Sequence, residues 1–130
     1  MIIDHMGFGV SDYPRAKAFY AQVLAPLGIT LMMEFGPEQT EGKVWACGFG
    51  KGGKPEFWIG SDGQTEPPMH IAFTADTRAE VRAFYGAALA AGGRDNGAPG
   101  LRPQYHPNYY GAFVFDLDGH NVEVVCHGSE

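Results

Sequence analysis

Residues 5–10 alternate strictly between apolar side chains and small or polar ones. This period of two predicts a strand with one apolar face. A helix is expected directly after it, because Ser11 or Asp12 can cap a helix before Pro14, and the helix ends by Gly28. Further strands are predicted at residues 29–35, 44–50 and 56–60.

Residues 70–93 repeat residues 5–28 at a spacing of 65 positions. Identical residues occupy the pairs His5/His70, Phe8/Phe73, Ala18/Ala83, Phe19/Phe84, Tyr20/Tyr85, Leu24/Leu89, Ala25/Ala90 and Gly28/Gly93. Chance would give roughly one or two identities over such a window. The second copy also offers a strand, a helix capped at Asp76 or Thr77, and strands at 111–116 and 121–126.

Two copies of a βαβββ unit predict an α+β fold, in which two modules form an open curved sheet with both helices on one face. We expect a single domain over residues 1–130, with repeat 1 at about 1–63 and repeat 2 at about 66–127. On the other face, Gly7, Gly9 and Ala72 would leave space for a concave pocket.

Polar residues recur on this pocket face. His5 and His70 hold the same position in the two repeats, and a pseudo-twofold relation would make their imidazoles converge. Glu123 lies between two valines that point the other way, and a carboxylate in such surroundings needs a partner. Glu56 aligns with Glu123 if two residues are added in the intervening loops.

Two imidazoles and one or two carboxylates suit one divalent metal ion, which could be Zn, Ni, Mn, Co or Fe. The alternative for each residue alone is simpler. A strand histidine is often only a hydrogen-bonded polar residue, and Glu56 could be a solvated strand start. The symmetric placement favours the metal set His5, Glu56, His70 and Glu123.

The chain resembles the vicinal oxygen chelate superfamily, which includes glyoxalase I, bleomycin and fosfomycin resistance proteins, and extradiol dioxygenases. The resemblance covers essentially the whole chain. It is carried by the stretches Ile3-Asp4-His5-Met6-Gly7, Arg15-Ala16-Lys17-Ala18-Phe19-Tyr20, His70-Ile71-Ala72-Phe73 and Asp116-Leu117-Asp118-Gly119-His120-Asn121-Val122-Glu123.

This resemblance implies a metal-dependent lyase or isomerase acting on a small substrate with vicinal oxygens, such as a 2-oxoaldehyde thiol adduct. The four ligands of glyoxalase I fall on His5, Glu56, His70 and Glu123, with Glu123 as the catalytic base and Glu56 assisting. A two-His, one-Glu Fe(II) dioxygenase would leave Glu56 out. A metal-free ligand-binding or antibiotic-resistance protein of the same fold is the third possibility.

A long stretch with little regular pattern covers residues 92–111, and such loops are usually functional. It supplies four of the expected substrate-pocket residues, Arg102, Tyr105, His106 and Tyr109. The fifth is Trp58, in the last strand of repeat 1, which could instead be a core residue. We expect His120, in a turn, and His127, at the terminus, to be exposed.

Composition limits the partners. The 130 residues carry a net charge of -6, which is unfavourable for binding nucleic acid. Only two cysteines are present, without a CxxC pair, and no apolar run is long enough to span a membrane. With no signal peptide evident, we expect a cytoplasmic protein with a small-molecule substrate. The paired modules and their edge strands predict a homodimer.

Overall fold

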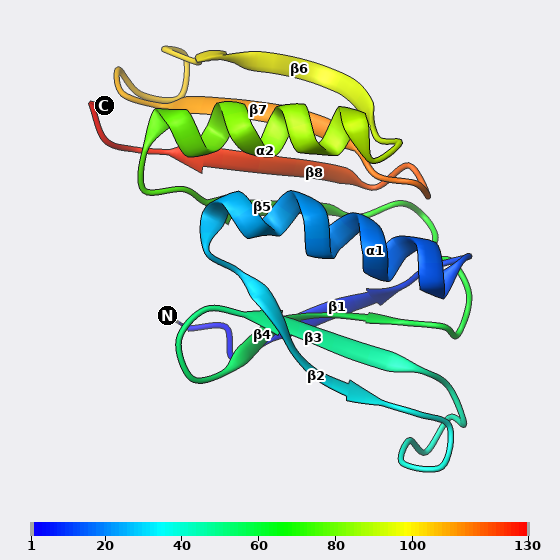
Figure 1. The fold of residues 1–130 in the computed structure, drawn as a ribbon. Coiled ribbons are helices and arrows are strands. Elements are labelled where there is room, and N and C mark those ends of the chain that lie inside the picture. The colour runs from blue at the N-terminus through cyan, green and yellow to red at the C-terminus, as the bar shows by residue number, and fades with distance from the viewer. Residues whose placement is uncertain (1, 130) are drawn as a thin grey trace.

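The computed structural model describes residues 2–129 as two modules of the same design (Figure 1). The first contains β1 (Met6–Gly9), α1 (Tyr13–Leu24), a short 3-10 helix η1 (Ala25–Leu27), β2 (Thr30–Phe35), β3 (Ala46–Gly50) and β4 (Pro55–Gly60). The second contains β5 (His70–Thr74), α2 (Arg78–Ala90), β6 (Arg94–Leu101), β7 (Tyr110–Phe115) and β8 (Asn121–Cys126). The predicted α+β architecture of two modules is confirmed.

Each module forms one four-stranded sheet, and the two sheets have the same strand order. The orders are β1-β4-β3-β2 and β5-β8-β7-β6. The first strand of each module runs parallel to the last, with Gly7 opposite Trp58 in one sheet and Ala72 opposite Glu123 in the other. Ala72 follows Gly7, and Glu123 follows Trp58, by the 65 positions found in the sequence. The repeat therefore holds for the strand register as well as for the order of the elements.

The helices lie side by side across the two sheets (Figure 1). Both begin at the predicted caps, where Asp12 accepts from the backbone N–H of Arg15 at 3.2 Å and Thr77 accepts from that of Glu80 at 3.1 Å. These bonds satisfy donors that a helix start leaves free. The apolar faces of helices and strands form one continuous core, which includes Phe19, Tyr20, Phe49, Phe57 and Phe84.

The two modules meet with β1 and β5 running in opposite directions. Met6, at the start of β1, lines a cavity together with Thr74, at the end of β5. Phe8, near the end of β1, contacts the ring of His120. His120 directly precedes Asn121, the first residue of β8, which pairs with His70 at the start of β5. An approximate twofold axis therefore relates the modules and places their equivalent residues at opposite ends of the boundary.

The stretch 92–111, expected to be irregular, contains strand β6. Its pairing with β7 shifts register on both sides of Gly97, where φ is 147°, and Pro99 lies within it. These residues interrupt the alternation by which a strand is found in a sequence. The irregular part is therefore shorter than expected and lies between β6 and β7.

His120 also departs from the prediction. Its side chain is completely buried, with Nδ1 accepting from the backbone N–H of Met69 at 2.8 Å. The turn pattern predicted exposure, but the twofold boundary encloses the ring against Phe8. His127 is exposed, as expected.

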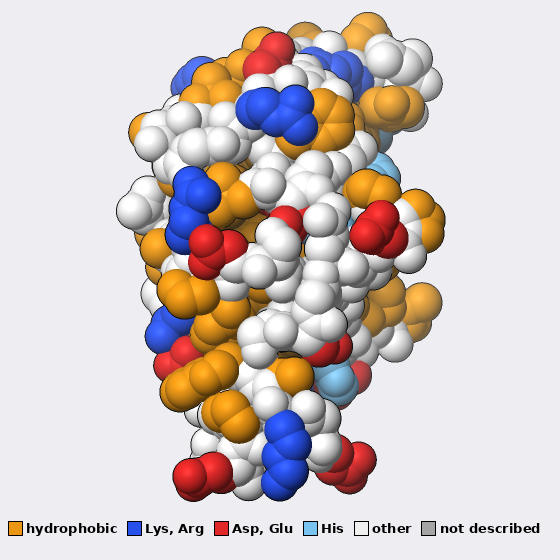
Figure 2. All heavy atoms as spheres, turned by 90° about the vertical axis from the view of Figure 1, so that its right-hand side faces the viewer, with side chains coloured by type: hydrophobic (Ala, Val, Ile, Leu, Met, Phe, Trp, Pro, Cys, Tyr) orange, Lys and Arg blue, Asp and Glu red, His pale blue; other side chains and the backbone are white. Residues whose placement is uncertain are grey.

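Charged side chains of both signs lie on the outer surface (Figure 2). Within residues 2–129 the helices are too short or too polar to cross a membrane. On the face shown in Figure 2, lysine and arginine side chains are interspersed with acidic, hydrophobic and neutral groups. That face offers no continuous basic surface for a nucleic-acid backbone.

Candidate functional site

The candidate site is centred on Glu123, in the middle of β8. Glu123 is only 3% exposed because buried strand neighbours cover it on both sides. A buried carboxylate is stable only with hydrogen-bond partners. Glu123 has two: the Nε2 atom of His70 lies 2.9 Å from Oε1, and the hydroxyl of Tyr109 donates to Oε2.

The hydrogen bonds set the protonation pattern of this group. Burial and the neighbouring Glu123 carboxylate raise the pKa of Tyr109 to about 12, so the phenol stays a neutral donor near pH 7. A carboxylate only accepts, so we assign the His70 proton to Nε2. The other ring nitrogen, Nδ1, is then available, on a side chain that is 56% exposed.

A positive charge lies beside this group. The guanidinium of Arg102 sits 5.4 Å from the ring centre of Phe113, which is the cross-strand neighbour of Glu123. Two bonds of 2.9 Å, to the backbone oxygens of Ala98 and Gly100, hold the guanidinium in place. It is therefore a fixed cation that could attract an anionic ligand.

Aromatic and imidazole rings surround Tyr109 on the loop side. Tyr105 and His106 lie with ring centres 4.8 and 5.4 Å away, and His127 also lies at 5.4 Å. The Nε2 of His106 and Nδ1 of His127 are 2.7 Å apart. The predicted pocket residues of the loop are thus brought together near Glu123. His127 was missed because nothing in the sequence connects residue 127 to the loop.

His5 lies elsewhere. Its Nδ1 is 2.6 Å from the carboxylate of its neighbour Asp4, and both side chains are exposed. Since β1 and β5 run in opposite directions, His5 and His70 mark opposite ends of the module boundary. The expected convergence of the two imidazoles therefore does not occur within the described part of one chain.

Glu56 is not the counterpart of Glu123. The register places Trp58 opposite Gly7, as Glu123 is opposite Ala72, so Trp58 holds the equivalent position without any added residues. Glu56 lies where the pairing jumps from Phe49–Phe57 to Gly50–Pro55. Such a bulge redirects a side chain, and Glu56 lines the cavity at the module boundary instead.

Trp58 forms an aromatic platform in the first module. Its ring stacks on Phe35 with centres 5.8 Å apart and planes 6° from parallel. The backbone passes close to both glycines, because a Cβ on Gly7 would meet the Trp58 backbone oxygen at 2.6 Å and one on Gly9 would meet that of Gly63 at 1.9 Å. Gly7, Gly9 and Trp58 nevertheless line a hollow of about 370 Å³, so the space expected at these two glycines is present in the first module.

One chain does not assemble a metal site from the predicted ligands. Among residues 2–129 no group of three or more His, Cys, Asp or Glu side chains is placed to hold a metal ion. His70 and Glu123 offer two donor atoms, whereas transition-metal sites in proteins take three or four ligands. The four predicted ligands therefore do not fit a metal ion within one chain.

Comparison with known proteins agrees with this architecture. A family model described as the Glyoxalase/Bleomycin resistance protein/Dioxygenase superfamily matches residues 2–124. No match was found among curated proteins.

Several solved structures share the fold. A glyoxalase/bleomycin resistance protein from Albidiferax ferrireducens has 22% identity and a TM-score of 0.70, covering 97% of this chain and 98% of that one. The fosfomycin resistance protein FosX from Listeria monocytogenes has 18% identity and a TM-score of 0.68, and the match covers 97% of this chain and 93% of the FosX chain. Glyoxalase I from Zea mays, with 19% identity and a TM-score of 0.70, covers 95% of this chain, which matches only 46% of the maize chain.

Proposed function

Because the chain belongs to the Glyoxalase/Bleomycin resistance protein/Dioxygenase superfamily, we propose that it is a lyase or isomerase that binds a small substrate with two neighbouring oxygens beside Glu123. The observation that carries this proposal is the buried carboxylate hydrogen-bonded to His70 and Tyr109. A buried carboxylate that orients an exposed imidazole is an arrangement suited to proton transfer.

His70 is the general base in this proposal. Its Nδ1 removes a proton from the carbon next to a substrate carbonyl, which leaves an enediolate, and returns the proton to the neighbouring carbon. Glu123 stabilises the imidazolium through Nε2, and the Arg102 charge favours the negative oxygens. This assignment differs from the predicted one, since both Glu123 oxygens already accept hydrogen bonds and Glu56 lies elsewhere.

Deuterium exchange into pyruvate tests this proposal. Pyruvate has two neighbouring oxygen-bearing carbons, and its methyl hydrogens lie next to the carbonyl. In D2O with EDTA, proton NMR should show catalysed loss of the methyl signal. His70→Gln should lower the rate at least about 100-fold, whereas His5→Gln should not change it. An exchange rate in His70→Gln equal to that of the wild-type protein would count against the proposal, as would the absence of catalysed exchange with pyruvate.

Metal-dependent lyase activity is the second candidate. FosX, one of the similar structures, is described as a complex with Mn(II) and a dihydroxypropylphosphonic acid. His70 Nε2 and Glu123 Oε1, at 2.9 Å, could supply two ligands to one ion if a second copy of the chain supplied His5 and Glu56. A bound divalent ion would polarise the substrate oxygens.

Metal content and oligomeric state separate the two candidates. The second candidate predicts about one metal ion per chain in a dimer, loss of the metal in both His5→Ala and His70→Ala, and loss of exchange with EDTA. The first predicts exchange that survives EDTA and does not depend on His5. Elemental analysis and light scattering on untagged protein give these values.

A further inference from the structure

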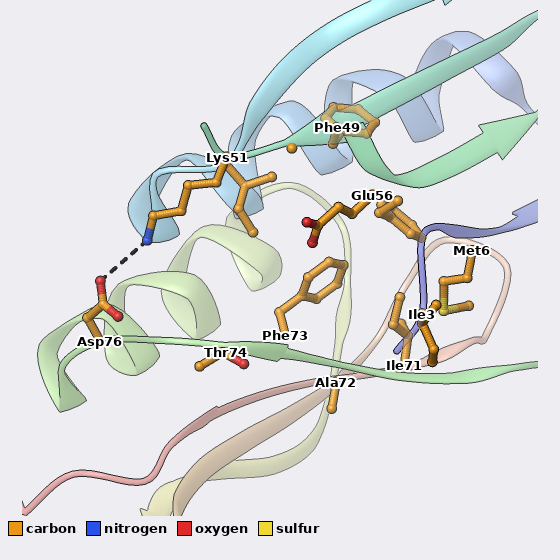
Figure 3. Close-up of a pocket in the computed structure, with 13 residues that line it drawn as sticks. Ile3, Met6, Phe49, Lys51, Glu56, Ile71, Ala72, Phe73, Thr74 and Asp76 are labelled. Carbon is orange, nitrogen blue, oxygen red and sulfur yellow. Dashed lines mark hydrogen bonds and ion pairs between the residues drawn. The ribbon is translucent and has the colours of Figure 1, made fainter. Parts of the chain in front are cut away.

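A cavity of about 340 Å³ opens at the boundary between the two modules. This volume lies within the range of small-ligand sites, roughly 300–1,000 Å³. Its walls are largely apolar and include Met6, Phe49, Phe57, Ile71 and Phe73 (Figure 3). Neither Glu123 nor Tyr109 lines it, although Ala72, the strand partner of Glu123, does.

The other end of the same boundary indicates what the cavity accepts. There the buried ring of His120 packs on Phe8, with ring centres 4.2 Å apart and planes 34° from parallel. Phe73 is the counterpart of Phe8, since the two differ by 65 positions and face the same register. A planar ring therefore fills one end of the boundary. At the other end the same spacing places Pro55, which has no planar ring, where the first end has His120, and Phe73 there lines the cavity.

The rims of the two ends are also equivalent. At the closed end the backbone N–H of Ser11 donates to Asp118 of the other module at 3.0 Å. At the open end the counterpart of Ser11 is Asp76, which pairs with Lys51 of the other module at 3.3 Å (Figure 3). Each contact joins a strand–helix loop to a hairpin, so the modules are connected across both ends.

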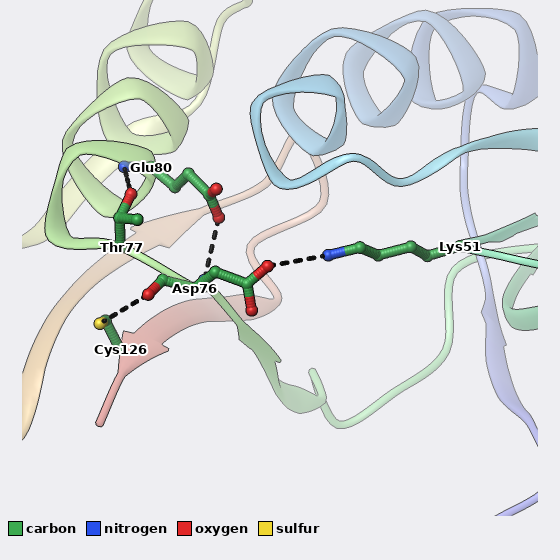
Figure 4. Close-up of polar contacts among 5 residues, drawn as sticks. All are labelled: Lys51, Asp76, Thr77, Glu80 and Cys126. Carbon is green, nitrogen blue, oxygen red and sulfur yellow. Dashed lines mark hydrogen bonds and ion pairs between the residues drawn. The ribbon is translucent and has the colours of Figure 1, made fainter. Parts of the chain in front are cut away.

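Asp76 is held in place by the start of α2. Its backbone N–H donates to the carboxylate of Glu80 at 2.9 Å, while the Glu80 N–H donates to Thr77 (Figure 4). This reciprocal pair of bonds is a capping arrangement of the kind that fixes a helix start. The backbone of Asp76, which pairs with Lys51, is therefore held in place at the cavity rim.

Glu56 gives the cavity its polar character. Glu56 is exposed to solvent and lines the cavity, where Figure 3 shows its carboxylate between Phe49 and Phe73. Within residues 2–129 it has no hydrogen-bond or ion-pair partner, whereas Asp76 already has Lys51. Two carboxylates and one ammonium leave a net negative charge at the cavity, which favours a cation.

From this geometry we propose that the boundary cavity binds a small planar aromatic ring that carries a positive charge. The ring packs on Phe73 as His120 packs on Phe8, and its cationic group pairs with Glu56. Stacking supplies the apolar contact and the carboxylate supplies the preference for a cation. This inference does not depend on the proposed role of His70, but it uses the Glu56 carboxylate that the metal-dependent candidate would assign to a metal ion.

Binding of benzylammonium to ¹⁵N-labelled protein tests the proposal. A fragment of this size should bind with a dissociation constant on the order of 1 mM. Its shifts should centre on the backbone amides of residues 49–51 and 71–76. Benzyl alcohol, which has the same ring without the charge, should bind about fivefold more weakly, because the ion pair is partly exposed.

Two matched variants check the role of the carboxylate. Glu56→Gln should weaken benzylammonium about fivefold and leave benzyl alcohol unchanged, whereas Glu41→Gln, an exposed carboxamide substitution away from the cavity, should change neither. Equal binding of the two probes, equal weakening by both variants, or shifts centred on Tyr109 would each overturn the proposal.

Discussion

Replacement of His120 should destabilise the fold more than replacement of any exposed histidine. His120→Ala removes a ring that is 0% exposed and packed on Phe8, and it leaves the Met69 N–H without its acceptor. Removal of a buried aromatic ring costs about 3 kcal/mol or more, and an unmatched buried donor about 1 kcal/mol. The free energy of unfolding should therefore fall by about 4 kcal/mol.

Urea unfolding followed by circular dichroism measures this change. His120→Phe retains a ring on Phe8 and loses only the acceptor. Since Nε2 of His120 has no partner among the described residues, this variant should lose only about 1 kcal/mol. His5→Ala, at an exposed site, should stay within about 0.5 kcal/mol of wild type. A loss below about 1 kcal/mol in His120→Ala would refute the view that this ring closes the module boundary.

Two further predictions concern other parts of the fold. Gly9→Ala should lower the free energy of unfolding by about 1–3 kcal/mol in urea melts, because its Cβ would lie 1.9 Å from the Gly63 oxygen; Gly86→Ala, with no atom within 4 Å, should be neutral or stabilising. The hydrogen bond from Lys17 lowers the pKa of Glu34. The resulting stability is present above the unfolded-state pKa and is lost as pH falls through the folded-state pKa, so Glu34→Gln should reduce the acid-side loss by about 1 kcal/mol or less. Identical slopes of stability against pH in the two proteins would contradict this.

The repeat in the sequence carried much of the fold. The spacing of 65 positions matches the strand order and the parallel pairing in both sheets. It could not show which ends of the modules meet. Equivalent residues of a twofold pair can lie together or far apart, and the direction of β1 against β5 places His5 and His70 apart. Packing between modules decides this, and local pattern does not report it.

Local irregularity explains the remaining differences in the site. Glu56 alternates correctly with Trp58 in the sequence, yet a bulge removes it from the expected face. By contrast, the loop residues Arg102, Tyr105, His106 and Tyr109 do lie near one another and near Glu123, and their role as substrate-pocket residues stays a prediction.

The outermost strands of the two sheets also affect how the chain behaves at high concentration. Strands β2 and β6 form the edges away from the module boundary, and each has a shift in register, between Leu31 and Met33 in one and around Gly97 in the other. A regular edge is a template for pairing with another molecule, and interruptions of this kind prevent it. The irregular edges therefore protect against sheet-to-sheet aggregation, even though Leu31 and Met33 expose apolar side chains to solvent.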